Sequence, residues 1–157
     1  MKAKPTGPRS TGEVVGKQVV LVSHNKLAEG MTGTVEMIFG KVDGLSHFCL
    51  TPDGNVVELG QKVRELALAH ADEQTVVVAD LMGGSVCNQC MQELYDLDNV
   101  KIVAGMSLPL VLGIVSVDGE LSDADLAQAV DEARQVTTVV ELPHPEESVA
   151  TGEDDFF

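Results

Sequence analysis

Short runs of apolar residues alternate along the chain with longer stretches in which apolar side chains recur every three or four residues. The short runs predict β-strands, and the periodic stretches predict α-helices. The predicted strands cover residues 18–23, 45–50, 75–79, 101–104 and 136–142. The predicted helices cover residues 26–39, 56–71 and roughly 85–95, followed by two that begin near Pro109 and after Ser122. Ser122 and Asp125 form the pattern of a capping box at the start of the last helix.

This alternation of strands and helices predicts an α/β fold. Helical crossovers between successive strands favour a parallel sheet with helices on both faces. The continuous β-branched run TVVVA at residues 75–79 is typical of a strand that is buried on both faces. We therefore expect a mainly parallel, doubly wound sheet of about four parallel strands.

The length of 157 residues suits one domain with a sizeable core. Residues 1–16 are polar and rich in glycine and proline, and we expect them to form a flexible N-terminal tail. Residues 143–157 contain five acidic residues and are interpreted as a solvated acidic C-terminal tail. The α/β domain is then expected to span residues 17–142.

The net charge of −15 argues against nucleic-acid binding, which needs clustered lysine and arginine. It favours a basic protein partner instead. The sequence lacks an apolar run long enough to span a bilayer and lacks the apolar centre of a signal peptide, so a cytoplasmic protein is expected.

His24 follows the first predicted strand directly and precedes a predicted helix. In parallel α/β sheets, ligands gather at the carboxyl ends of the strands. The free N–H groups at a helix start attract anions, and a neutral imidazole is a competent nucleophile. His24 is therefore a candidate nucleophile, with a helix cap or a packing residue as the alternative.

Asp80 follows the third predicted strand and is expected at the same edge of the sheet as His24. A carboxylate that accepts the proton of one imidazole nitrogen fixes the tautomer and directs the other lone pair outward. The alternative is a turn aspartate without chemistry. The next turn contains Gly83, Gly84 and Ser85, which are candidate phosphate-binding residues but do not form a Walker loop.

Cys87 and Cys90 form a CxxC motif, which occurs in redox and zinc sites. A zinc site would need further ligands from Cys49, His47 or His70, and their spacing follows no known zinc pattern. We therefore favour packing cysteines and expect neither metal nor cofactor. The three histidines other than His24 are interpreted as structural or surface residues without an obvious partner: His47, His70 and His144.

Three stretches carry a family resemblance: VLVSHNKLAEGM, VVVADLMGGSVCN and KIVAGMSLPLVL. They resemble, in order and spacing, three blocks of the enzyme IIA component of the mannose-family sugar phosphotransferase system (PTS), over roughly residues 17–142. The resemblance implies that His24 carries a phosphoryl group, that Asp80 hydrogen-bonds the histidine and that Ser85 lies beside the phosphate. It also implies a phosphotransferase without a cofactor.

The same resemblance implies an antiparallel C-terminal edge strand at residues 136–142, exchanged between the two subunits of a homodimer. The implied partners are the phosphocarrier HPr as donor and a IIB component as acceptor, with the membrane sugar-permease components as indirect partners. Two positions depart from the family pattern, because Val86 stands where proline is usual and Ser107 where asparagine is usual.

Two other functions fit the same architecture. One is the phosphodonor subunit for dihydroxyacetone kinase, although the DLMGGS loop fits the sugar system better. The other is a non-enzymatic regulatory domain that senses phosphorylation.

Overall fold

The computed structural model describes residues 16–145, which form a parallel sheet covered by helices. Within these residues the sheet has four strands in the order β2-β1-β3-β4, and all neighbouring strands are parallel. The strands are β1 (Lys17–His24), β2 (Leu45–Leu50), β3 (Gln74–Ala79) and β4 (Val100–Ala104). The helices are α1 (Leu27–Phe39), α2 (Val56–Ala69), α3 (Ser85–Leu94), α4 (Leu108–Val115) and α5 (Asp123–Gln135). The predicted parallel α/β sheet is thereby confirmed.

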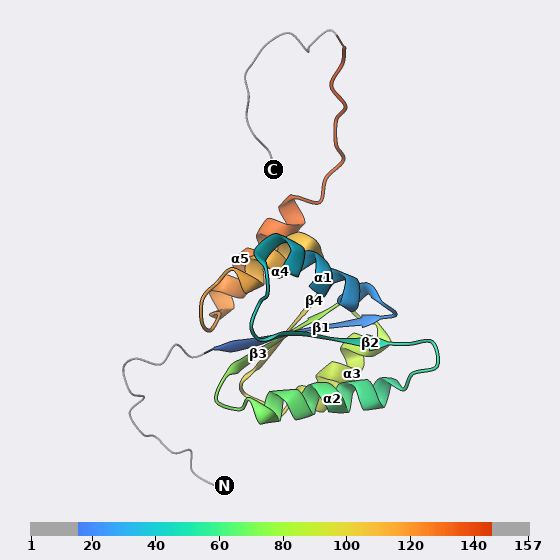
Figure 1. Cartoon of the computed structure of the whole chain (residues 1–157), viewed down its shortest axis with the longest axis vertical. Helices are drawn as coiled ribbons and strands as arrows, with labels where there is room; N and C mark the ends of the chain where they lie inside the picture. Colours follow the sequence, from blue (N-terminus) through green and yellow to red (C-terminus); the bar gives the residue numbers. More distant parts are fainter. Residues whose placement is uncertain (1–15, 146–157) are drawn as a thin grey trace.

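The helices lie in two layers, with α2 and α3 on one face of the sheet and α1, α4 and α5 on the other (Figure 1). Alternate side chains of β1 pack against the two helix layers, because successive side chains of a strand point to opposite faces of the sheet. Val19 and Leu21 pack with α1, α4 and α5, whereas Val20 and Val22 pack with α2 and α3. The sheet is therefore doubly wound, as expected.

Strand β3 is buried along its whole length, because β1 and β4 pair with its two edges and helices cover both faces. This agrees with the prediction from its β-branched run. The central pair of strands, β1 and β3, ends at His24 and Ala79, and Asp80 follows directly. These two ends set the position of the candidate site.

The antiparallel C-terminal strand predicted at residues 136–142 is not confirmed, because the single chain forms no strand there. Val136 ends α5, and the following residues up to 144 adopt no regular structure. This segment leads away from the domain, so its backbone has no neighbouring strand to pair with (Figure 1). The apolar side chains of Val139, Val140 and Leu142 remain 90%, 76% and 81% exposed.

The described residues exclude most of the two predicted tails, because residues 1–15 and 146–157 lie outside them. Between residues 16 and 145, no helix is long and apolar enough to cross a bilayer.

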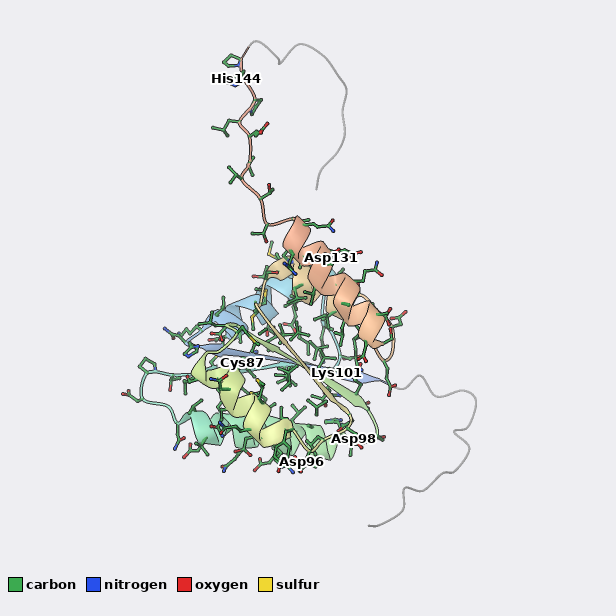
Figure 2. The ribbon with its side chains drawn as sticks, turned by 180° about the vertical axis from the view of Figure 1, so that it is seen from behind. Cys87, Asp96, Asp98, Lys101, Asp131 and His144 are labelled. Atoms are coloured by element: carbon green, nitrogen blue, oxygen red, sulfur yellow. The ribbon has the colours of Figure 1, made fainter. Side chains whose placement is uncertain are left out.

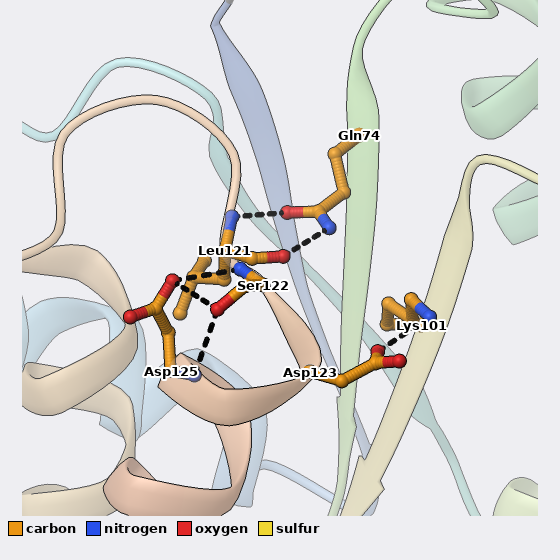
Figure 3. Close-up of polar contacts among 6 residues, drawn as sticks. All are labelled: Gln74, Lys101, Leu121, Ser122, Asp123 and Asp125. Atoms are coloured by element: carbon orange, nitrogen blue, oxygen red, sulfur yellow. Dashed lines mark hydrogen bonds and ion pairs between the residues drawn. The ribbon is translucent and has the colours of Figure 1, made fainter.

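The amino end of the sheet is joined to the loop before α5 by a buried glutamine (Figure 3). The Gln74 side-chain N–H donates to the Leu121 carbonyl at 2.8 Å, and its oxygen accepts the Leu121 N–H at 2.8 Å. The predicted capping box follows at once. The Ser122 hydroxyl accepts the Asp125 N–H at 3.1 Å, and the Asp125 carboxylate accepts the Ser122 N–H at 2.7 Å. These contacts fix where α5 begins.

Candidate functional site

The structure brings His24 and Asp80 together at the carboxyl ends of the two central strands. Nδ1 of His24 lies 2.8 Å from Oδ2 of Asp80. The backbone N–H of His24 donates to the same oxygen, also at 2.8 Å. Because β1 and β3 are adjacent and parallel, their carboxyl ends meet, and this places the two side chains in contact. One carboxylate oxygen thus holds both the main chain and the ring of the histidine.

Asp80 is present as a charged carboxylate at neutral pH. Burial alone would raise its pKa, because its side chain is only 10% exposed and Oδ1 has no hydrogen-bond partner among the described residues. The hydrogen bonds from the main chain and the ring of His24 outweigh burial and hold the pKa of Asp80 below its usual value. A charged carboxylate only accepts hydrogen bonds. The neutral ring of His24 therefore carries its proton on Nδ1.

This assignment leaves the lone pair on Nε2, the opposite nitrogen of the His24 ring. Nε2 lies 3.1 Å from Oγ of Ser85, whose hydroxyl donates to it. The His24 side chain is 44% exposed, so one side of the ring is open to solvent. Asp80 thus orients the ring through Nδ1, while the exposed side of the ring leaves Nε2 accessible.

The glycine turn between Asp80 and α3 allows the start of α3 to approach the histidine ring. Gly83 has a φ of 77°, in the left-handed region that favours glycine. A Cβ on Gly84 would lie 3.3 Å from Cε1 of His24 and 3.2 Å from the carbonyl of Leu81. A larger residue there would push the turn away from the ring.

Helix α3 presents its N-terminus beside the ring, because it begins at Ser85. Within the described chain, no side chain caps its first turn. Uncapped N–H groups and the positive end of the helix dipole favour an anion at this point. Of the predicted set, Ser85 contacts Nε2 and Gly84 lies against Cε1 of the ring, while Gly83 supplies the left-handed turn before them.

Two exposed apolar side chains follow Asp80 directly, and the hydrophobic pattern does not identify them as site residues. Leu81 is 59% and Met82 is 73% exposed. Only their position in the sequence could have indicated a site role. Two apolar residues in a turn at the carboxyl edge of the sheet are too far from the core to be buried in it. They leave apolar surface exposed in the turn that follows Asp80.

The CxxC motif lies in the core on the α2–α3 side of the sheet. Cys87 and Cys90 are both buried and free. Burial, with smaller contributions from Cys87 and Glu93, raises the pKa of Cys90 to about 12, so its thiolate is not available at neutral pH. In the part of the chain that the structure describes, no group of three or more His, Cys, Asp or Glu could hold a metal ion. These observations support a packing role for both cysteines.

The other histidines lie away from the site, and two of them have partners that the sequence did not reveal. Nδ1 of His47, in β2, lies 3.1 Å from Oγ1 of Thr32. His70 follows α2, and its Nδ1 lies 3.4 Å from Oε2 of Glu73. Figure 2 shows His144 on the extended segment beyond α5.

The two departures from the family pattern preserve the local structure. Val86 is buried in the first turn of α3 and packs in the core. Ser107 is the N-cap of α4, where its hydroxyl accepts the Leu110 N–H at 3.4 Å. Both helices therefore begin at the carboxyl edge of the sheet without proline or asparagine at these positions.

Comparisons with known proteins identify the family. A family model described as the PTS system fructose IIA component, EIIA-man, matches residues 18–143. The sorbose-specific EIIA component of the PTS of Klebsiella pneumoniae is 31% identical over 109 residues, which cover 69% of this chain and 80% of that protein.

Solved structures show the same fold. A PTS IIA protein associated with the fucose utilization operon of Streptococcus pneumoniae is 27% identical, with a TM-score of 0.70 over 79% of this chain and 93% of that one. A mannose/sorbose-specific IIA subunit of Enterococcus faecalis superposes with a TM-score of 0.74 at 23% identity, over 82% of this chain and 98% of that one. The family model spans most of the sequence, and the chain therefore belongs to the EIIA-man family, the IIA components of the mannose-family sugar phosphotransferase system.

Proposed function

We propose that this chain is a phosphocarrier that accepts a phosphoryl group from phospho-HPr on Nε2 of His24 and passes it to a IIB component for sugar uptake. The observation that carries the proposal is the geometry of the His24 ring. Asp80 binds Nδ1 at 2.8 Å, and Nε2 faces Ser85 and the start of α3. The ring is thus set to attack with Nε2.

The transfer needs only one bond exchange. The lone pair of Nε2 attacks the phosphorus of the phosphohistidine on HPr, the new N–P bond forms, and the old N–P bond breaks. The imidazole of HPr leaves with the bonding electron pair. Transfer to a histidine of the IIB component repeats this exchange with His24 as the leaving group. Positioning and electrostatics dominate such transfers, and the protein supplies both here.

Asp80, Ser85 and the glycine turn act at different points of this exchange. The Asp80 carboxylate stabilises the positive charge that develops on the His24 ring as Nε2 bonds to phosphorus. The Ser85 hydroxyl, which donates to Nε2 in the free protein, turns to a phosphoryl oxygen once Nε2 is occupied. The uncapped first turn of α3 lies beside the same oxygens.

Labelling with phosphoenolpyruvate, enzyme I and HPr tests this proposal. We expect one phosphoryl group per chain, stable in alkali and lost in acid, as for a phosphoramidate. The His24→Ala variant should fold and stay unlabelled, whereas the control variants His47→Ala and His70→Ala should label as the wild type does. An unlabelled wild type, or a label that mass spectrometry places on another histidine, would contradict the proposal.

Onward transfer separates the phosphocarrier from its alternatives. A PTS carrier passes the group to a matching IIB component, and a dihydroxyacetone-kinase donor passes it to that kinase. A regulatory domain retains it.

We also propose that the protein is a homodimer in which residues 136–142 pair with the sheet of a second subunit. The support is their exposed apolar side chains and the open edges of β2 and β4, since uncovered apolar edges favour pairing with another chain. Light scattering at micromolar concentration should find a dimer. A chain truncated before Val136 should dissociate or aggregate. A monodisperse full-length monomer would contradict this assembly.

A further inference from the structure

The side chain that caps helix α1 belongs to strand β1 and precedes His24 in the sequence. Ser23 is fully buried one residue before His24, and its hydroxyl oxygen accepts the Ala28 N–H at 2.8 Å. Lys26, which occupies the N-cap position of α1, makes no side-chain cap in the described structure. In α5, by contrast, the residue at the N-cap position itself supplies the cap. The bond from Ser23 therefore closes a short loop that contains His24.

The same hydroxyl holds the turn that follows the histidine. Ser23 donates to the Asn25 carbonyl at 3.2 Å. The Asn25 N–H donates to the Leu50 carbonyl at the end of β2 at 2.8 Å. With a φ of 48°, Asn25 is the one non-glycine residue between positions 16 and 145 in the left-handed region. Bonds on both sides hold this strained residue in place.

These contacts fix His24 from two directions. On one side its N–H and its ring share the Asp80 oxygen, and on the other the Asn25 peptide is tied to β2 and to Ser23. This backbone sets the position and direction of the Cα–Cβ bond that carries the ring. If the turn relaxed, the 2.8 Å bond between Nδ1 and Asp80 would lengthen, and Nε2 would no longer face Ser85.

We propose that Ser23 is a positioning residue for phosphoryl transfer, because its hydroxyl sets the direction and the tautomer of the His24 ring. This inference rests on the proposed function of His24 and adds a residue that touches neither the ring nor the phosphate. Misplacement of a reacting group by about 1 Å costs on the order of a hundredfold in rate, so loss of this hydroxyl should be visible in the transfer step.

The variants Ser23→Val and Ser23→Thr test the role of the hydroxyl, because valine and threonine have nearly the same shape and only threonine carries a hydroxyl. Rapid-quench transfer from phospho-HPr should be slowed about tenfold or more in Ser23→Val and stay within about threefold of wild type in Ser23→Thr. The apparent KM for phospho-HPr should change little in either, because the docking surface is intact. Ser23→Ala, which adds no bulk, serves if the valine variant does not fold.

The nitrogen-15 chemical shifts of the His24 ring provide a readout that helix capping alone would not move. The wild type and Ser23→Thr should show the proton on Nδ1, whereas Ser23→Val and Ser23→Ala should show a mixture of both tautomers. Ser122→Ala, which removes the cap of α5, is the matched control. It should lower the melting temperature without changing the transfer rate or the His24 shifts.

Wild-type rates and an Nδ1-protonated ring in Ser23→Ala would overturn the role of Ser23, and so would equal losses in the valine and threonine variants without a loss in the alanine variant. If the wild type takes no phosphate, the proposed function fails. The ring shifts, which need no phosphate donor, then still test the positioning by themselves.

Discussion

Polar side chains at the amino end of the parallel sheet join distant segments of the chain, whereas those at the carboxyl end converge on one histidine. At the amino end, side chains bind the main chain of distant segments. Gln74 holds both backbone groups of Leu121, and the Asn99 side chain donates to the Glu73 carbonyl at 3.0 Å. At the carboxyl end, Asp80 and Ser85 bind the two ring nitrogens of one histidine.

Exposure separates the two ends as well. Gln74 is only 8% exposed, and both of its amide atoms are bonded to Leu121. The His24 side chain is 44% exposed, and among the described residues its Nε2 is hydrogen-bonded only to the Ser85 hydroxyl, which is able to rotate away. A buried amide whose nitrogen and oxygen are both hydrogen-bonded contributes to stability. A half-exposed ring with one nitrogen held and the other replaceable is suited to a reaction. The comparison assigns stability to the amino end and chemistry to the carboxyl end.

Among substitutions that test the difference between the two ends of the sheet, the largest loss of phosphoryl-transfer rate is expected at Asp80. Asp80→Ala should fold, since the hydrogen bonds of this side chain go to His24 at the end of β1, but it should transfer phosphate about a hundredfold more slowly. The ring would lose both its tautomer lock and the charge that stabilises it. Asp80→Asn, which keeps the size but removes the charge, should also be slow. Rapid-quench transfer from phospho-HPr measures both rates.

Asp125→Ala is the matched control for Asp80. The pKa of Asp125 is also lowered, by hydrogen bonds from Ser122, yet this carboxylate lies in the capping box of α5. Its loss should leave the transfer rate unchanged. Equal rates in wild type and Asp80→Ala would remove Asp80 from the mechanism and erase the difference between the two ends.

The pairing of His24 with Asp80 was predictable because it depends on two rules that need only the sequence. Apolar runs mark the ends of the strands, and parallel strands bring their carboxyl ends to one edge. The same reasoning placed Gly83, Gly84 and Ser85 beside the pair. The capping box at Ser122 was predictable for a similar reason, since it depends on residues only three positions apart.

Features that depend on three-dimensional approach were not predictable from the pattern. The close approach of Gly84 to the His24 ring and the left-handed φ of Asn25 follow from how two turns meet. The sequence pattern gives Ser23 no role beyond that of a strand residue, and its hydrogen bond from the Ala28 N–H is visible only in the structure. Residues 136–142 show the converse. Their apolar pattern predicts a strand, but a strand also needs a neighbour, and the single chain does not place one beside them.

A smaller effect, on stability alone, is expected at Gln74. Gln74→Ala leaves the N–H and the carbonyl of the buried Leu121 without partners, which should lower the free energy of unfolding by about 2 kcal/mol. Urea unfolding measures this loss. Gln128→Ala is the control, because Gln128 is exposed on α5 and, in the part of the chain that the structure describes, hydrogen-bonds only the Glu132 side chain. Its free energy of unfolding should change by no more than about 0.5 kcal/mol. Both variants should accept phosphate from phospho-HPr at the wild-type rate, since neither residue lies at the carboxyl edge. A slowed transfer in a folded Gln74→Ala protein would show that the amino end also shapes the site, and the division between the two ends would no longer hold.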